Sequence, residues 1–292
     1  MSANENGEIA EPKAPEWATQ PLGDFLKYIT QLAEVVDLST AGIQALKSIP
    51  VIEGILDELS ASEEKLKTPH EQASREKSRR LAKLAHRESS TGFPLIHAQA
   101  TVSLWGALED LIRTFVASWL RQVPAVLVNP PLSTIKVEVG DYEKLSPEEK
   151  GLFLADALDR EVRGPLAHGV TRFEALLKPL GLSGSVPDSL KKDIFELGQV
   201  RHLIAHRRGI ADRKLMNACP WLNITLGSPF VVSHADFARY YGAVHDYALE
   251  LTFRIAEHFG VPNLRERVAA HLAELKLGDK GKPNPPGQDN TP

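Results

Sequence analysis

The 292-residue chain contains a single cysteine, Cys219, and this scarcity removes two classes of site. One cysteine cannot form a disulfide within the chain, and it cannot supply the several thiolates of a cysteine-based zinc site. Cysteine between apolar or bulky neighbours is most often a small packed side chain. We therefore expect no catalytic role for Cys219.

The sequence also lacks two signals of a membrane or secreted protein. Its first residues are acidic and polar, without the apolar core of a secretory signal. No run of apolar residues approaches the roughly 20 that a membrane-spanning helix requires. We therefore expect a cytoplasmic protein with no membrane partner.

A strong overall charge is missing as well. The formal net charge is -4 and the isoelectric point is near 6.2. A global positive field that attracts polyanions is excluded, so any nucleic-acid binding must depend on a local basic patch. Hydrophobic residues at 42% and charged residues at 25% are ordinary for a soluble globular protein.

Apolar residues recur at steps of three and four along most of the chain, which predicts amphipathic helices. The segment 94–122 is the most hydrophobic of them and should pass through the core. A short strand is possible at 134–139, and a small β-hairpin at 224–226 and 230–232 around Gly227. We predict an all-α bundle of about six to eight helices with this small hairpin after the motif helix described below.

The composition divides the chain into four segments. Residues 1–16 and 277–292 are polar tails that we expect to be disordered. Residues 17–92 form an N-terminal helical extension, and residues 93–276 form the main helical domain. The charged stretch 63–89 is either a basic surface for RNA phosphates or a solvated helix held by ion pairs, and we favour the solvated helix.

The most informative stretch runs from Ser189 to Lys214, and most of it, up to about Gly209, is predicted to be a single helix. Near its end Arg201 precedes His206 with four residues between them, and His202 follows the arginine directly. No helix-breaking residue interrupts these positions, so all three side chains belong to one helix. The cluster of one guanidinium and two imidazoles is the candidate site.

The arginine-to-histidine spacing is weak by itself, because Arg163 and His168 also match it. Gly164 and Pro165 lie inside that second match, and proline after glycine prevents a continuous helix there. We treat the second match as coincidence.

Helical geometry gives the candidate cluster more weight than its spacing does. At 100° per residue, Arg201 falls on the apolar half of its helix and needs a partner, for which we select Glu109 on the core helix. Phe195, His202 and His206 align on the other side. An aromatic residue with two imidazoles on such a face suggests a site or a subunit contact.

Glu109 also has a second expected partner. Arg113 lies four residues further along the same helix and on the same face. An ion pair within the helix is the default interpretation of this spacing. The alternative is that the Glu109 carboxylate supports a site elsewhere, because burying an unpaired charge is costly.

The motif and its surroundings resemble the HEPN family (higher eukaryotes and prokaryotes nucleotide-binding). Members carry an arginine, a polar residue and a histidine at this spacing near the end of a late helix, as Arg201, His202 and His206 stand here. The continuation 206–212 and an acidic core helix like 105–113 are also similar. The resemblance covers about residues 94–260.

The resemblance implies a function as well as a fold. Many HEPN proteins are metal-independent endoribonucleases, in which a 2′-hydroxyl attacks the adjacent phosphate to leave a 2′,3′-cyclic phosphate and a 5′-hydroxyl. By this likeness Arg201 would bind the scissile phosphate, and His206 with His202 would exchange protons. No metal or cofactor is implied. One departure is Arg208, where some toxin members carry a tyrosine.

The implied partners follow the same likeness. The substrate would be RNA, most simply single-stranded, contacted by Arg207, Arg208 and Lys214 at the end of the motif helix. Arg201 and His206 are about 140° apart around one helix, so we expect a two-fold homodimer with a composite active site. A toxin–antitoxin or phage-defence context, with an antitoxin or defence partner protein, is implied by the family.

Three other interpretations of the same residues stay open. The chain could be a non-catalytic HEPN-like module that binds nucleotides or a partner protein. His202 and His206 have the spacing of two metal ligands on one helix face, although no third ligand is apparent. The histidines could also be structural residues at a helix end.

Overall fold

The computed structural model describes residues 12–59, 68–162 and 169–279, and within these ranges the chain is helical and has no β-strand. The prediction of an all-α fold is confirmed. Within these ranges the structure has one isolated antiparallel β-bridge, between Ile210 and Pro229.

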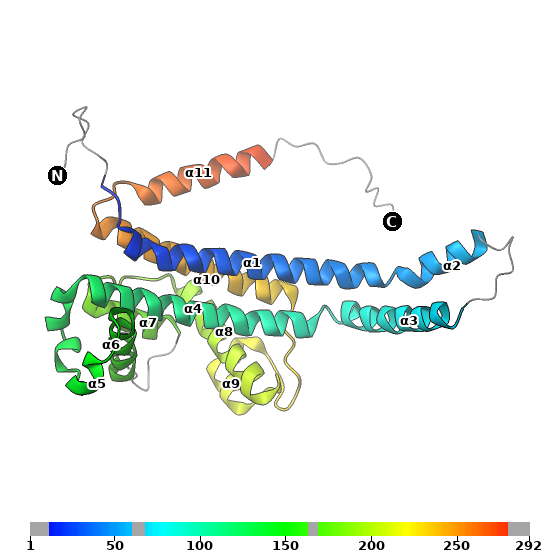
Figure 1. The fold of residues 1–292 in the computed structure, drawn as a ribbon, viewed down its shortest axis with the longest axis horizontal. Helices are drawn as coiled ribbons and strands as arrows, with labels where there is room; N and C mark the ends of the chain where they lie inside the picture. The colour runs from blue at the N-terminus through cyan, green and yellow to red at the C-terminus, as the bar shows by residue number, and fades with distance from the viewer. Residues whose placement is uncertain (1–11, 60–67, 163–168, 280–292) are drawn as a thin grey trace.

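Three long helices form the centre of the molecule: α1 (Glu16–Leu46), α4 (Pro94–Gln122) and α10 (His234–His258). They lie side by side, with α1 antiparallel to the other two (Figure 1). Their buried faces meet in one core that includes Trp119 and Tyr240, both fully buried.

The first half of α1 belongs to this core. Four of its residues, Ala18, Leu22, Phe25 and Ile29, are buried with α4 and α10 in the same cluster, and Val36 beyond the midpoint of α1 is buried there as well. A boundary near residue 92 therefore does not coincide with a boundary in the packing. Instead, the second half of α1 leaves the body together with α2 (Ile49–Leu59) and α3 (Pro69–Ser90) (Figure 1).

One helical stretch, Glu16–Leu59, is long and apolar enough to cross a membrane by length and composition alone. This differs from the expectation that no segment would qualify. Only 6% of its most apolar window is buried in the structure. The window is so little buried because apolar side chains of both α1 and α2 are exposed here, among them Val35, Leu38 and Ile52.

Shorter helices follow α4 in the chain, and the second and third of them pack against it. They are α5 (Val139–Glu143), α6 (Pro147–Val162) and α7 (Val170–Leu177). Helix α6 begins as its sequence predicts, because Ser146 and Glu149 cap each other's backbone amides at 3.2 and 2.8 Å. At Gly151 it approaches α4 so closely that an added Cβ would lie 2.7 Å from the Ala117 carbonyl oxygen.

The predicted motif helix is α8 (Asp188–Arg207), which crosses α4 and projects below it (Figure 1). It ends at Arg207, close to Gly209 as expected, because Arg208 and Gly209 adopt positive φ angles of 54° and 75°. A separate short helix, α9 (Arg213–Ala218), then starts after the capping side chain of Asp212.

The expected β-hairpin at 224–226 and 230–232 is not formed. Phe230 donates its amide to the Gly209 carbonyl at 2.7 Å, and Ala211 and Ser228 bond at 2.9 Å. The segment therefore pairs with the turn after α8 rather than with itself. The strand proposed at 134–139 is also not formed, since a 3-10 turn ends at Thr134 and extended residues lead into α5.

A buried carboxylate joins α8 to α10. Glu196 is 1% exposed and accepts hydrogen bonds from the Tyr240 hydroxyl at 2.6 Å, from Arg239 at 2.5 Å and from the Trp221 indole. Burial, followed by the bond to Glu196, raises the pKa of Tyr240 far above its usual range. Because every contact is charge-assisted, this network fixes the orientation of α8.

The crossing of α4 and α8 depends on a glycine, and this gives a stability prediction. A Cβ at Gly198 would lie 2.9 Å from the Trp105 indole, whereas one at Gly242 of α10 would meet nothing within 4 Å. We expect Gly198→Ala to lower the free energy of unfolding by about 1–3 kcal/mol. Gly242→Ala should be neutral or stabilising by up to about 1 kcal/mol.

Urea unfolding followed by circular dichroism measures both variants. Equal stabilities for the two alanine variants would contradict the close contact between Gly198 and Trp105.

Candidate functional site

The motif arginine, Arg201, points from α8 toward α4. Its side chain is one third exposed, and its Nη2 lies 3.7 Å from Oε2 of Glu109. The predicted pairing of these two residues is present in the structure. The Arg201 Nε is buried and has no hydrogen-bond partner within the described residues.

Glu109 holds a second guanidinium that the sequence did not reveal. Arg172, on α7, donates from Nη1 to Glu109 Oε1 at 3.0 Å and clamps both carboxylate oxygens of Asp159 at 2.8 Å. The hydrogen bonds to Asp159 are the largest cause that raises the pKa of Arg172. A chain of alternating charges thus links Asp159 of α6 to Arg201 of α8.

The expected ion pair between Glu109 and Arg113 within α4 is not formed. Arg113 instead donates to both carboxylate oxygens of Asp156 on α6, at 2.6 and 2.8 Å. A bidentate contact with a neighbouring helix has better geometry than a pair along one helix. The Glu109 carboxylate is therefore left to Arg172 and Arg201.

The two motif histidines lie together near the end of α8. The ring centroids of His202 and His206 are 4.7 Å apart, with the planes tilted by 51°. His206 is exposed and His202 is half-buried. Burial, the charge of Lys214 and then His206 lower the pKa of His202, so this imidazole is neutral at pH 7 and can accept a proton.

Phe195 only partly follows the prediction. It is half-buried and packs against the core, close to the backbone of Gly169 at the start of α7. The exposed part of the face is therefore formed by the histidines rather than by an aromatic stripe.

The three predicted phosphate-binding cations surround the end of the motif helix. Arg207, Arg208 and Lys214 are all exposed. Arg207 lies 3.8 Å from Asp212, the residue that caps α9. Exposed cations next to two imidazoles can attract a phosphate group.

The second sequence match, Arg163 and His168, lies outside the described residues. For the described part of the chain, no three His, Cys, Asp or Glu residues are grouped so that they could hold a metal ion. His202 and His206 have no third ligand among those residues.

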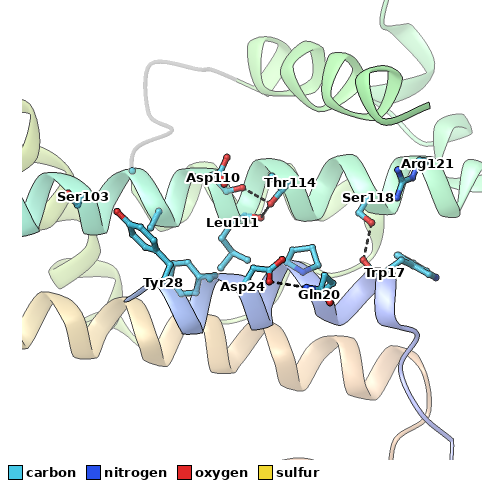
Figure 2. A pocket seen from close by; sticks show the side chains of 14 residues that line it. Trp17, Gln20, Asp24, Tyr28, Ser103, Asp110, Leu111, Thr114, Ser118 and Arg121 are labelled. Carbon is cyan, nitrogen blue, oxygen red and sulfur yellow. Dashed lines mark hydrogen bonds between the residues drawn. The ribbon is translucent and has the colours of Figure 1, made fainter. Parts of the chain in front are cut away.

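Two of the hollows beside α4 are about 410 Å³ or larger, and one of them is lined by Glu109, the carboxylate that faces Arg201. A pocket of about 410 Å³ between α4, α6 and α7 is lined by Glu109, Asp159 and Arg172. A larger groove of about 680 Å³ lies between α1 and α4. Figure 2 shows the side chains that line it, among them the carboxylates of Asp24 and Asp110. None of the predicted site residues lines this groove.

Comparisons of the chain with known protein families, with curated proteins and with solved structures found no match.

Arg113 of α4 and Arg172 of α7 allow a prediction about how burial changes the contribution of an ion pair to stability. Arg172 and Arg113 both clamp an aspartate of α6, but the Arg172–Asp159 pair is 23% and 15% exposed and the Arg113–Asp156 pair 44% and 45%. We expect Arg172→Met to lower the free energy of unfolding by about 2–3 kcal/mol. The substitution removes the hydrogen bonds that Arg172 donates to the partly buried carboxylates of Asp159 and Glu109. Arg113→Met should cost less than about 1 kcal/mol.

Chemical unfolding of both variants tests this difference. If Arg113→Met destabilised the protein as much as Arg172→Met, the partly buried ion pairs of Arg172 would contribute no more to stability than the exposed pair of Arg113.

Proposed function

We propose that this protein is a metal-independent endoribonuclease of the HEPN type. The observation that carries the proposal is the arrangement on α8, where Arg201 is followed by His202 and His206 with their rings 4.7 Å apart. The exposed cations at the end of the helix support a phosphate ligand. The resemblance of the motif to that family supplies the reaction.

In the proposed reaction the 2′-hydroxyl of the RNA attacks the adjacent phosphorus and the bond to the 5′-oxygen breaks. A neutral imidazole accepts the proton of the 2′-hydroxyl, and a protonated imidazole donates one to the departing 5′-oxygen. His202 is suited to the first task because its pKa is lowered. His206, which is exposed, is then the proton donor.

Arg201 would stabilise the negative charge that develops on the phosphate oxygens. To do so it must exchange part of its contact with Glu109 for the phosphate. Its contact with Glu109 is long, at 3.7 Å, whereas Arg172 holds the same carboxylate at 3.0 Å. Arg172 thus keeps Glu109 in place while Arg201 moves to the substrate.

The site requires two copies of the chain in this proposal. Arg201 faces the core helix, whereas His206 points to solvent on another side of α8. One phosphate cannot contact both groups of the same helix without a large rearrangement. A two-fold homodimer would place the arginine of one copy near the histidine of the other.

The alternative is a HEPN-like module without catalysis, which binds nucleotides or a partner protein. The contact between Arg201 and Glu109 favours it to the extent that the carboxylate competes with phosphate. A toxin or phage-defence role, with an antitoxin or defence protein as partner, belongs to this family likeness as well.

Incubation of the purified protein with labelled single-stranded RNA in excess EDTA tests the proposal. We expect cleavage to continue in chelator and to leave cyclic phosphate ends. His206→Ala and Arg201→Ala should each reduce the rate roughly 100-fold or more. His86→Ala, on the exposed face of α3, is the matched control and should cleave normally.

Two outcomes would contradict the proposal. Loss of cleavage on adding EDTA would indicate a metal-dependent reaction. RNA binding without cleavage, weakened in the Arg207→Ala and Lys214→Ala variants, would favour the non-catalytic module.

A further inference from the structure

The segment that leaves the body of the molecule presents an apolar surface to solvent. We define the arm as residues 35–59 together with α3, and Figure 1 shows the end of α1, α2 and α3 extending beyond α4 and α10. Helix α2 contains no buried residue. Several of its large apolar side chains are more than half exposed.

Packing within the arm is inverted relative to an ordinary amphipathic helix. The half-buried side of α2 carries the acidic residues Glu53 and Asp57, and Arg75 of α3 clamps the Asp57 carboxylate, with one contact at 2.7 Å. Ile49 and Pro50 are half-buried as well, whereas the other large apolar side chains of α2 are exposed, namely Val51, Ile52, Ile55, Leu56 and Leu59. Since a surface helix normally buries its apolar face, this face is available to a partner.

The exposed face follows a seven-residue repeat. Apolar or small residues alternate at steps of three and four over more than three heptads. The eight positions are Val35, Leu38, Gly42, Ala45, Ile49, Ile52, Leu56 and Leu59. We call this row the seam, and all of it except Ile49 is exposed.

The helix is only briefly irregular between the two halves of the seam. Lys47 and Ser48 form turn-type hydrogen bonds to Gln44 and Ala45, and helical bonding resumes from Ser48. Pro50 explains the interruption, because it lacks an amide proton. A heptad repeat predicts a left-handed coiled coil with another helix.

We propose that the seam is a self-association surface, where the arms of two copies pair as an antiparallel coiled coil. The order of side-chain sizes supports this occupant. When two seams run in opposite directions about a two-fold axis, Gly42 faces the partner's Ile52, and Ala45 faces the partner's Ile49. The outer layers pair Leu38 with the partner's Leu56.

Each small residue thus meets a large one, as close packing requires. A parallel pair would place glycine against glycine and alanine against alanine, which leaves voids along the middle of the seam. The antiparallel pair is also isologous, because the same layers occur twice about the axis.

The area of the seam is sufficient for a stable contact. Its five large exposed side chains are between 52% and 76% exposed. At roughly 100 Å² each, two copies would remove on the order of 1,000 Å² from water, the size expected of a biological interface.

The charge of the residues beside the seam favours a second copy of the chain over RNA or an anionic membrane as its partner. The exposed residues beside the seam include Glu34, Asp37 and Glu58. These carboxylates, at the two ends of the seam, repel the phosphates of RNA and the headgroups of anionic lipids. A second seam, which is mostly apolar, carries no such penalty at its centre.

The first test measures the molar mass of the full chain by light scattering. We expect the wild type to exceed the 32.1 kDa monomer, and the double variant Ile52→Glu and Leu56→Glu to have half the wild-type mass. Val51→Glu is the matched control, because Val51 is 64% exposed on the same helix but lies off the seam. Its mass should not change.

The second test measures the direction of pairing by cysteine cross-linking. Leu38→Cys and Leu56→Cys lie about 27 Å apart along one helix, at a rise of 1.5 Å per residue. Mixed and mildly oxidised, the two single variants should form a disulfide between copies, whereas each alone should not. The native Cys219 does not compete, because it is buried and burial raises its pKa to about 12.

Three results would overturn the inference. They are a monomeric wild type, a mass that is unchanged by Ile52→Glu with Leu56→Glu, or cross-linking of each single variant with itself. Binding of the wild type to phosphatidylserine vesicles, lost in the double variant without any change of mass, would assign the seam to a membrane instead. A monomeric wild type would also contradict the composite site, whereas an unchanged mass of the double variant would overturn this inference alone and leave the proposed ribonuclease untouched.

Discussion

The position of the motif depends on one carboxylate, Glu109 of α4. It receives Arg172 from α7 at 3.0 Å and faces Arg201 from α8 at 3.7 Å, and Arg172 is itself clamped to Asp159 of α6. Four helices therefore meet at a chain of alternating charges. Partly buried charges are stable only when they are paired, so this chain, together with the Glu196 network, fixes which side of α8 faces the body.

That orientation has consequences for the rest of the site. With Arg201 directed at α4, the other side of α8 carries His202 and His206 outward, next to the cations that follow Arg207. The motif is consequently divided between an inner and an outer side of one helix. The arm lies beyond the N-terminal end of α4 (Figure 1). Pairing through the seam would therefore leave the C-terminal end of α8 uncovered.

The sequence predicted those features that depend on local periodicity. Ser146 and Ser233, each followed three residues later by an acidic residue, cap the starts of α6 and α10, a pattern that is legible in the sequence. The apolar arc of α8 identified the side on which Arg201 meets Glu109. Features that depend on contacts between distant segments were not predictable in this way. Arg172 reaches Glu109 only because α7 packs beside α4, and the residues near Gly227 pair with the turn after α8 instead of forming a hairpin.

The central proposal is that the motif forms a catalytic site shared between two copies, because Arg201 and His206 point to different sides of α8. Mixing the inactive Arg201→Ala and His206→Ala variants under conditions that exchange subunits tests it most directly. Half of the dimers would then be mixed, and each would have one of its two sites intact, so about one quarter of wild-type RNA cleavage should return. No recovery, in a mixture shown to exchange subunits, would contradict the account.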